Sequence, residues 1–349
     1  MLSVDDFLQR PGPIIDVRSP SEYDQGHLPG ARSLPLFTDD ERAEVGTCYK
    51  QQGRDAAVEL GLERVGPKLA TFARQAKAWT HAEDGNPVRV HCWRGGMRSS
   101  SMAWLLETAG LSPVVLEGGY KAFRRWVRHT LSRQRPILTL GGMTGTGKTL
   151  VLMALAQRGE QVLDLEGLAH HRGSSYGSLG LPPQPTNEQF ENRVAMAWER
   201  CSPPRPVWIE AESRRVGACR VPDELFAQMM AAPVVQIVRS PEERIQILEA
   251  EYGQADPEEL IAATQRIRKR LGGLRTQEAI DAIGRGDLGT AIGLVLSYYD
   301  KTYRYDLEQR QPPQHTVDVT GLTPPQAAER LCQAVYEAVP ISDRVSKAG

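Results

Sequence analysis

The sequence predicts an α/β protein made of two doubly wound parallel-sheet domains. Short apolar segments typical of strands alternate with helical segments in both halves, an order typical of parallel strands with helices on both faces. At 349 residues, the chain is also too long for one ordinary hydrophobic core. Pro136 interrupts a helical segment, and a new strand begins there. We therefore expect a first domain over residues 1–130, a linker over 131–136, a second domain over 137–340 and a tail over 341–349.

The elements of the first domain follow from apolar runs and glycine stops. The expected strands are PIIDV (13–17), PVRVHC (87–92) and PVVLEGG (113–119). The expected helices are SSSMAWLLETAG (99–110) and YKAFRRWVRHTLSRQ (120–134). Ligands of parallel sheets bind at the carboxyl ends of the strands, and Cys92 falls at such an end.

The second domain opens with a strand, a glycine-rich loop and a helix, in LTLGGMTGTGKTLVLMALAQRG. Its expected strands cover residues 136–142, 161–166, 206–212, 233–239 and 315–321. Helical spacing predicts helices over 187–201 and 240–253. These segments complete a second doubly wound unit.

Composition and cysteine spacing exclude several classes of protein. No apolar run approaches the roughly 18 residues of a transmembrane helix, and the acidic N-terminus is unlike a signal peptide. We therefore expect a cytoplasmic protein with no membrane partner. The 5 cysteines form no CxxC pair, which argues against a disulfide framework and against a structural metal site.

The segment RVHCWRGGMRSS (89–100) has the features of an activated cysteine loop. Cys92 would be the nucleophile, because a helix N-terminus and inward-pointing backbone amides lower the pKa of a thiol and bind an oxyanion. The glycines allow a tight curl, the arginines add positive charge, and Ser99 can cap the helix. The expected anion-binding residues are Arg94, Gly95, Gly96, Arg98 and Ser99.

The segment GGMTGTGKTL (141–150) contains the P-loop pattern GxxxxGK[ST], also called Walker A, between a strand and a helix. Its amides would wrap a diphosphate, Lys148 would neutralise phosphate oxygens, and Thr149 could bind Mg²⁺. The expected diphosphate-binding residues are Gly142, Thr144, Gly145, Thr146, Gly147, Lys148 and Thr149. Glu210 and Glu212 are candidate Mg²⁺ partners, and Arg172 is a candidate for anion binding.

Basic residues gather where the two domains join. No acidic residue occurs from Gly118 to Gly159, so a local positive surface is expected although the formal net charge is −1. The candidate nucleic-acid contacts are Lys121, Arg124, Arg125, Arg128, Arg133 and Arg135. RIRKR (266–270) is a second, weaker basic cluster.

The first domain resembles the rhodanese superfamily. IIDVRSPSEYDQGHLPGARSLPL (14–36) is similar to the opening signature of that family, and LEGGYKAFRRW (116–126) is similar to its closing one. The resemblance implies a persulfide-type carrier cysteine at Cys92.

The spacing within the loop leaves two chemistries open. Common sulfurtransferase loops place an arginine five residues after the cysteine, whereas Arg98 lies six residues after Cys92. This spacing also fits His-Cys-x5-Arg, the signature of cysteine phosphatases, with His91 in the histidine position. A larger loop can hold a larger or tetrahedral anion, so selenium chemistry and phosphate release are both considered.

The ordered motifs CWRGGMRS, GGMTGTGKT, DLEGLAHHRGSSYG and EAESRRVG cover nearly the whole chain and together resemble the tRNA 2-selenouridine synthase family. The resemblance implies a rhodanese-like domain followed by a P-loop NTPase-like domain. It also implies conversion of wobble 2-thiouridine in the tRNA anticodon loop to 2-selenouridine through S-geranyl-2-thiouridine. The co-substrates would be geranyl diphosphate and selenophosphate, with Mg²⁺ as a candidate ion and no organic prosthetic group. A selenophosphate-supplying enzyme is a candidate partner.

Two other functions fit part of the sequence. The first is a cysteine-dependent phosphatase with a regulatory P-loop domain, favoured by the spacing of Cys92 and Arg98. The second is a P-loop small-molecule kinase with an inactive rhodanese module, favoured by the kinase-like ending HTVDVTGLTPPQAAERL. Neither explains both motifs.

Overall fold

The computed structural model describes residues 1–81, 86–211, 213–308 and 314–338, and the chain forms two compact units. Unit 1 comprises Met1–Thr130 and Glu191–Met196, and unit 2 comprises Leu131–Phe190 and the residues from Ala197 onward. The division falls inside helix α7 (Gly119–Ser132), which extends into the expected linker. The expected tail, residues 341–349, lies outside the described residues.

Unit 1 contains a four-stranded parallel sheet in the order β2-β1-β3-β4. The strands are β1 (Ile14–Asp16), β2 (Ala31–Ser33), β3 (Val88–His91) and β4 (Pro113–Val115). Three of them were expected, whereas β2 was not, because its residues, ARS, contain no apolar run. Its helices are α1 (Val4–Gln9), α2 (Pro20–Gln25), α3 (Asp39–Gln52), α4 (Arg54–Val65), α5 (Leu69–His81), α6 (Met97–Thr108) and α7, with a 3₁₀ turn at Gly66–Lys68.

The core of unit 1 packs around β3, the strand that directly precedes Cys92. Val88, Val90 and Cys92 pack with Met102 and Leu106 of α6 in one hydrophobic cluster. Because alternate residues of β3 face this cluster, the position of Cys92 is fixed by burial of the strand before it.

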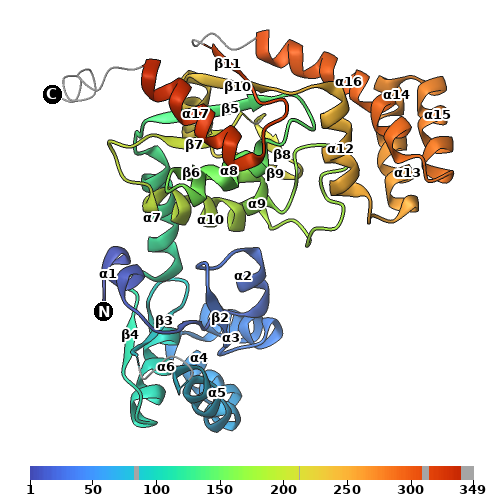
Figure 1. Ribbon diagram of the computed structural model, residues 1–349. Helices are drawn as coiled ribbons and strands as arrows, with labels where there is room; N and C mark the ends of the chain where they lie inside the picture. The colour runs from blue at the N-terminus through green and yellow to red at the C-terminus, as the bar shows by residue number, and fades with distance from the viewer. Residues whose placement is uncertain (82–85, 212, 309–313, 339–349) are drawn as a thin grey trace. The chain divides into compact units, whose positions relative to one another are not determined.

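Unit 2 contains a five-stranded parallel sheet in the order β11-β10-β5-β7-β6. The strands are β5 (Ile137–Gly142), β6 (Gln161–Leu163), β7 (Val207–Glu210), β10 (Val234–Val238) and β11 (Gln314–Asp318). β8 (Arg215–Val216) and β9 (Cys219–Arg220) form a separate antiparallel pair. β5 is central, and the chain extends the sheet first on one side of it and then on the other (Figure 1). The loop after β5 therefore lies at a topological switch point, where α/β proteins bind ligands.

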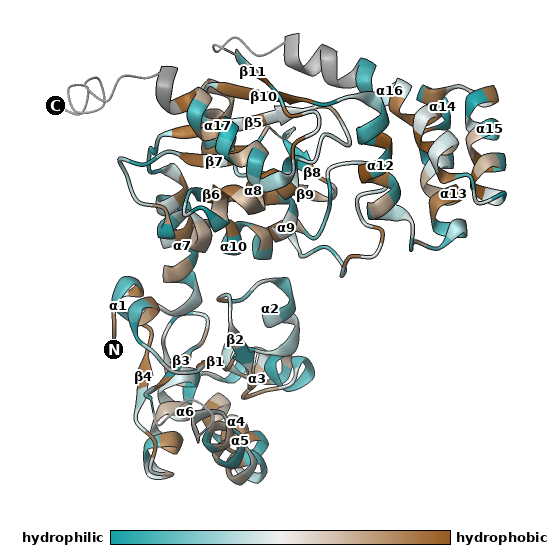
Figure 2. Cartoon of the chain, in the orientation of Figure 1, coloured by the Kyte–Doolittle hydropathy of each residue, from teal (hydrophilic) through white to brown (hydrophobic). Residues whose placement is uncertain are grey.

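The helices of unit 2 form two groups. α8 (Lys148–Gln157) and α17 (Pro324–Ala338) pack together on the sheet, burying apolar residues of β5, β7, β10 and β11; the apolar character of β10 is visible in Figure 2. The remaining helices are α9 (Leu165–Ala169), α11 (Asp223–Ala231) and α10 (Asn187–Arg200), of which Glu191–Met196 belong to unit 1. A second group has its own core and comprises α12 (Pro241–Tyr252), α13 (Pro257–Arg266), α14 (Arg268–Leu271), α15 (Gly273–Gly284) and α16 (Leu288–Glu308).

The expectation of two α/β parallel-sheet domains is confirmed. The expected strands of both halves are present, with shorter ends than the apolar runs suggested. Within the part of the chain that the structure describes, none of the helices combines the length and apolar character needed to cross a membrane.

Candidate functional site

The cysteine loop of unit 1 connects the end of β3 to the start of α6. The Cys92 side chain is only 3% exposed, and its Sγ lies 3.2 Å from Ser99 Oγ. Burial by itself raises the pKa of the Cys92 thiol. Hydrogen bonds from the Ser99 hydroxyl and from the amides of Arg94 and Ser99, together with the charge of Arg98, outweigh burial and lower that pKa below its usual 9.0. The loop therefore favours a thiolate, as an activated nucleophile requires.

The role expected for Ser99 as a helix cap is wrong. α6 starts at Met97, its N-cap is Gly96, and no side chain caps it. Ser99 lies inside the first turn, where its hydroxyl is 3.0 Å from the Gly96 carbonyl and faces Cys92. The Ser99 hydroxyl therefore contacts the Cys92 sulfur and hydrogen-bonds the loop backbone at Gly96.

Glycines allow the loop to pack closely against the start of α7. Gly95 has φ 66°, and a Cβ there would lie 2.6 Å from the Leu116 carbonyl oxygen. Gly119 has φ 58°, and a Cβ there would overlap the Cys92 carbonyl and the Gly95 amide. The Tyr120 amide also donates to the Cys92 carbonyl at 2.8 Å. Residues 116–120 (LEGGY) thus pack against the cysteine loop and support it. This packing gives a physical reason for the rhodanese-like similarity of residues 116–126.

The positive charge of Arg98 is paired inside unit 1. Its Nη1 lies 2.5 Å from a carboxylate oxygen of Glu22, a residue of α2. Burial raises the pKa of Glu22, but the hydrogen bond and charge of Arg98 lower it below its usual range. Sequence reasoning did not identify Glu22 as the partner of Arg98.

A buried ion pair lies at the end of the neighbouring strand. Arg18 donates to both carboxylate oxygens of Asp16, at 3.0 and 2.6 Å, and also to the Gly26 carbonyl. His91 Nε2 lies 3.6 Å from the same Asp16 carboxylate, and burial lowers the pKa of His91. His91 is thus a neutral, fully buried residue on the strand, one position before the cysteine.

The phosphate cradle of unit 2 is the expected diphosphate-binding loop, residues 142–149, which joins β5 to α8. Gly145 and Gly147 both have φ 82°, which favours glycine. The Lys148 ammonium donates to the Gly142 carbonyl at 2.8 Å, within the same loop. The expected residues from Gly142 to Thr149 therefore form one contiguous strand–loop–helix turn, with the amides at the N-terminus of α8 available to an anion.

Two carboxylates meet the Thr149 hydroxyl. Thr149 Oγ1 lies 3.0 Å from Glu210 Oε1 and 3.3 Å from Glu166 Oε2. Both glutamates are buried: Glu210 is the last residue of β7, and Glu166 lies in α9, directly after the neighbouring strand β6. Sequence reasoning missed Glu166, although its position shortly after β6 was a usable signal. Glu212 lies outside the described residues.

This oxygen set fits Mg²⁺, which prefers carboxylate, hydroxyl and phosphate oxygens and keeps several waters. Across residues 1–81, 86–211, 213–308 and 314–338, no group of three or more His, Cys, Asp or Glu side chains is arranged to hold a metal ion. Thr149, Glu210 and Glu166 would hold a magnesium ion here together with oxygens of the diphosphate.

The cradle opens into a cavity of about 930 Å³ with basic walls. Arg172 lines it and lies 2.6 Å from the Glu251 carboxylate of α12. Arg266 and Arg270, at the ends of the basic cluster 266–270, line the same cavity. The structure thus brings three arginines, from two segments of the chain, to the cavity beside the P-loop.

The six basic residues proposed for nucleic-acid contact divide into two sets. Lys121, Arg125 and Arg128 are exposed on α7 at a spacing that places them on one helix face. The others form internal pairs: Arg124 with Glu191 in unit 1, and Arg133 and Arg135 with Glu199 in unit 2. The exposed basic face of α7 therefore consists of three of the six residues that the sequence predicted for nucleic-acid contact.

The family models and the related proteins that match this chain agree on one family. A family model described as tRNA 2-selenouridine synthase AAA domain matches residues 135–320, and one described as rhodanese-like domain matches residues 3–125. A relative from Marinobacter nauticus named tRNA 2-selenouridine synthase is 39% identical, over 86% of this chain and 89% of the relative. Relatives of the same name from Pseudomonas syringae pv. syringae and Salmonella schwarzengrund are 38% and 37% identical, over 85% of this chain and 89% and 90% of theirs. The chain therefore belongs to the tRNA 2-selenouridine synthase family.

Proposed function

We propose that this protein is a tRNA-modifying transferase that converts wobble 2-thiouridine to 2-selenouridine through S-geranyl-2-thiouridine. The observation that carries the proposal is the presence, in one chain of this family, of a buried thiol with a lowered pKa and a complete phosphate cradle. Geranyl diphosphate and selenophosphate would be its co-substrates. The reaction is a cytoplasmic one and depends on another enzyme for selenophosphate.

The cradle serves the first step, geranylation. The thiocarbonyl sulfur of the base attacks C1 of geranyl diphosphate, the S–C bond forms, and the C–O bond breaks with its electrons leaving on diphosphate. Lys148 and the loop amides stabilise the charge that develops on this leaving group. Bound Mg²⁺, held by Thr149 with Glu210 and Glu166 beside it, would add positive charge at the same oxygens.

The cysteine loop serves the second step, selenation. The Cys92 thiolate attacks phosphorus of selenophosphate, so that an S–P bond forms, the P–Se bond breaks and hydrogen selenide leaves. Selenide then attacks C2 of the geranylated base, and the C2–S bond breaks as geranylthiolate leaves. Water hydrolyses the S–P bond, which releases phosphate and restores the thiol. The loop amides and Arg94 hold the tetrahedral anion during this sequence.

The exposed basic face of α7 supports binding of tRNA phosphates. A wobble base is in a loop, so it leaves its stack more easily than a paired base and can enter a pocket.

The deciding experiment is mass spectrometry of nucleosides from a 2-thiouridine-containing tRNA incubated with the protein and geranyl diphosphate, with and without selenophosphate. We expect S-geranyl-2-thiouridine without selenophosphate and 2-selenouridine with it. Unchanged 2-thiouridine in both reactions of a folded protein would overturn the proposal.

A cysteine phosphatase is the second candidate, because six positions separate Cys92 and Arg98. Hydrolysis of p-nitrophenyl phosphate that disappears in Cys92→Ser, together with unchanged 2-thiouridine, would favour it.

A further inference from the structure

We propose that an apolar pocket of unit 2, beside the phosphate cradle, binds the hydrocarbon tail of the prenyl diphosphate and limits its length. The pocket lies among α12, α13, α15, α16 and the segment after α9, and it is narrow: its cavity volume is about 40 Å³, against about 930 Å³ for the phosphate cavity. The inference rests on the proposed geranylation, and names the residues that would recognise its donor.

The pocket is continuous with the phosphate cavity. Five residues line both: Thr144, Ser174, Leu248, Tyr252 and Tyr299. Thr144 belongs to the phosphate loop itself, and its carbonyl accepts a hydrogen bond from Arg244 Nε at 2.9 Å, which ties the loop to α12. A diphosphate in the cradle therefore places its attached carbon near this shared boundary.

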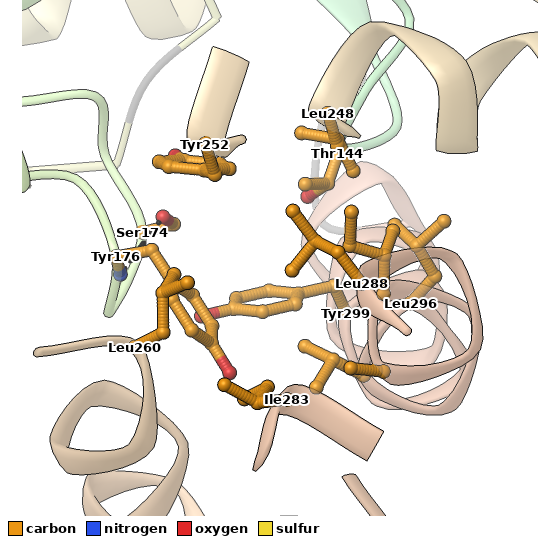
Figure 3. A pocket seen from close by; sticks show the side chains of 13 residues that line it. Thr144, Ser174, Tyr176, Leu248, Tyr252, Leu260, Ile283, Leu288, Leu296 and Tyr299 are labelled. Atoms are coloured by element: carbon orange, nitrogen blue, oxygen red, sulfur yellow. Dashed lines mark hydrogen bonds between the residues drawn. The ribbon is translucent and has the colours of Figure 1, made fainter. Parts of the chain in front are cut away.

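The walls beyond the boundary are apolar and come mainly from one stripe of α16. Leu288, Ala291, Ile292, Val295 and Leu296 line the pocket, at the spacing of a single helix face. Leu260 of α13 and Ile283 of α15 complete it on the side away from Thr144, as Figure 3 shows. Binding of a hydrocarbon chain here is favourable, because it removes apolar surface of the chain and of the pocket from water.

The polar atoms of the lining tyrosines are bonded within the protein. The Tyr176 hydroxyl lies 2.7 Å from Thr264 Oγ1, and the Tyr299 hydroxyl accepts a hydrogen bond from the Ser175 amide at 3.0 Å. Burial raises the pKa of Tyr176 to about 12, so its hydroxyl stays neutral. Their rings, which lie in the centre of Figure 3, offer apolar faces to a ligand. A nucleobase needs specific hydrogen-bonding partners, whereas a prenyl chain needs only this apolar surface.

The test compares binding of geranyl diphosphate with binding of inorganic pyrophosphate by calorimetry, using the full chain without tRNA. The two ligands differ in the tail and in charge, and a substitution in the pocket changes neither charge, so the change in their affinity ratio from wild type to variant reports the pocket. We expect geranyl diphosphate to bind wild type at least about tenfold more tightly than pyrophosphate. Ala291→Phe, which fills the pocket, should bring this ratio close to one and leave pyrophosphate affinity unchanged. Leu274→Phe, at a position 75% exposed on α15, is the matched control and should keep the wild-type ratio.

A second variant changes the length of the pocket. Ile283→Ala should raise the affinity for farnesyl diphosphate relative to geranyl diphosphate by about fivefold or more, because it frees volume at the end away from the cradle. This ratio is independent of the fraction of folded protein, so it also serves if Ala291→Phe does not fold.

Two results would overturn the pocket: equal binding of geranyl diphosphate and pyrophosphate by wild type, or wild-type donor ratios in both pocket variants. If the nucleoside assay shows geranylation while these ratios stay unchanged, the pocket fails and the function stands. If the ratios change as expected but no geranylated nucleoside forms, the function fails and the pocket stands.

Discussion

The carboxylate of Glu22 lies 2.5 Å from the guanidinium of Arg98, and the two residues are 76 positions apart in the chain. Arg98 is also one of the groups that lower the pKa of Cys92. Glu22 therefore controls how much of the Arg98 charge reaches the thiolate. The hydrogen bond and charge of Arg98 outweigh burial and lower the pKa of Glu22 below its usual 4.5, so both partners of the pair are charged at neutral pH.

Substitutions of Glu22 and of Arg98 should shift the pKa of Cys92 in opposite directions. Glu22→Gln leaves the Arg98 charge unpaired and should lower the pKa, whereas Arg98→Gln should raise it. Since the thiolate is the deprotonated form, its fraction at neutral pH should increase in the first variant and decrease in the second. Thiolate absorbance followed against pH, with Cys92→Ser subtracted, measures both. Arg64→Gln, which breaks a surface pair with Glu44, is the control, and a shift of the same sign in both variants would contradict this account.

Cys92→Ser should separate the two chemical steps. Selenation should fall on the order of 10³-fold or more, since a hydroxyl does not supply the thiolate nucleophile, while geranylation should persist. Nucleoside mass spectrometry should then find S-geranyl-2-thiouridine accumulating even with selenophosphate present. Cys48→Ser should behave as wild type, and full selenation by Cys92→Ser would remove Cys92 from the reaction.

Lys148→Ala should have the reverse effect. Loss of a cation at the leaving group should slow geranylation by about 10²–10³-fold. Selenation of a tRNA that is already S-geranylated should continue, because the cysteine loop is intact. Lys77→Ala is a suitable control on a helix of unit 1. Equal loss of both activities would show that Lys148 does not act on one step alone.

Thr149→Val should weaken the response of geranylation to Mg²⁺. The variant removes the hydroxyl that meets Glu210 and Glu166, and we expect the Mg²⁺ concentration for half-maximal rate to rise by about tenfold or more. Thr149→Ser keeps the hydroxyl and should stay close to wild type. The measurement is a titration of MgCl₂ after treatment with EDTA, and a wild-type rate unaffected by EDTA would exclude the ion from this step.

Binding of tRNA should depend on salt through the exposed face of α7. Replacing Lys121, Arg125 and Arg128 by alanine should weaken binding and reduce the slope of log K against log salt by about 0.7–0.9 for each phosphate that the protein no longer neutralises. Arg133→Gln should change the slope less, because Arg133 is paired with Glu199. Filter binding over a range of KCl concentrations distinguishes the two, and an unchanged slope in the triple variant would place the tRNA elsewhere.

The two binding loops could be predicted from the sequence because each is encoded by neighbouring residues. Gly95 and Gly147 have positive φ values within short strand–loop–helix segments, so the residues that shape each loop are neighbours in the sequence. The predicted cap at Ser99 failed at this same level, because the helix begins at Met97, two residues before the expected range 99–110.

The sequence by itself determined the alternation of strands and helices, the cysteine loop and the phosphate cradle, since periodicity and glycine placement are local properties. Only the tertiary structure decided that Glu166 joins Glu210 at Thr149, that Glu22 pairs with Arg98, and that α16 lines a pocket beside the cradle. Each of these contacts joins residues far apart in the chain. The path of the chain through the sheets creates them, and no local pattern specifies that path.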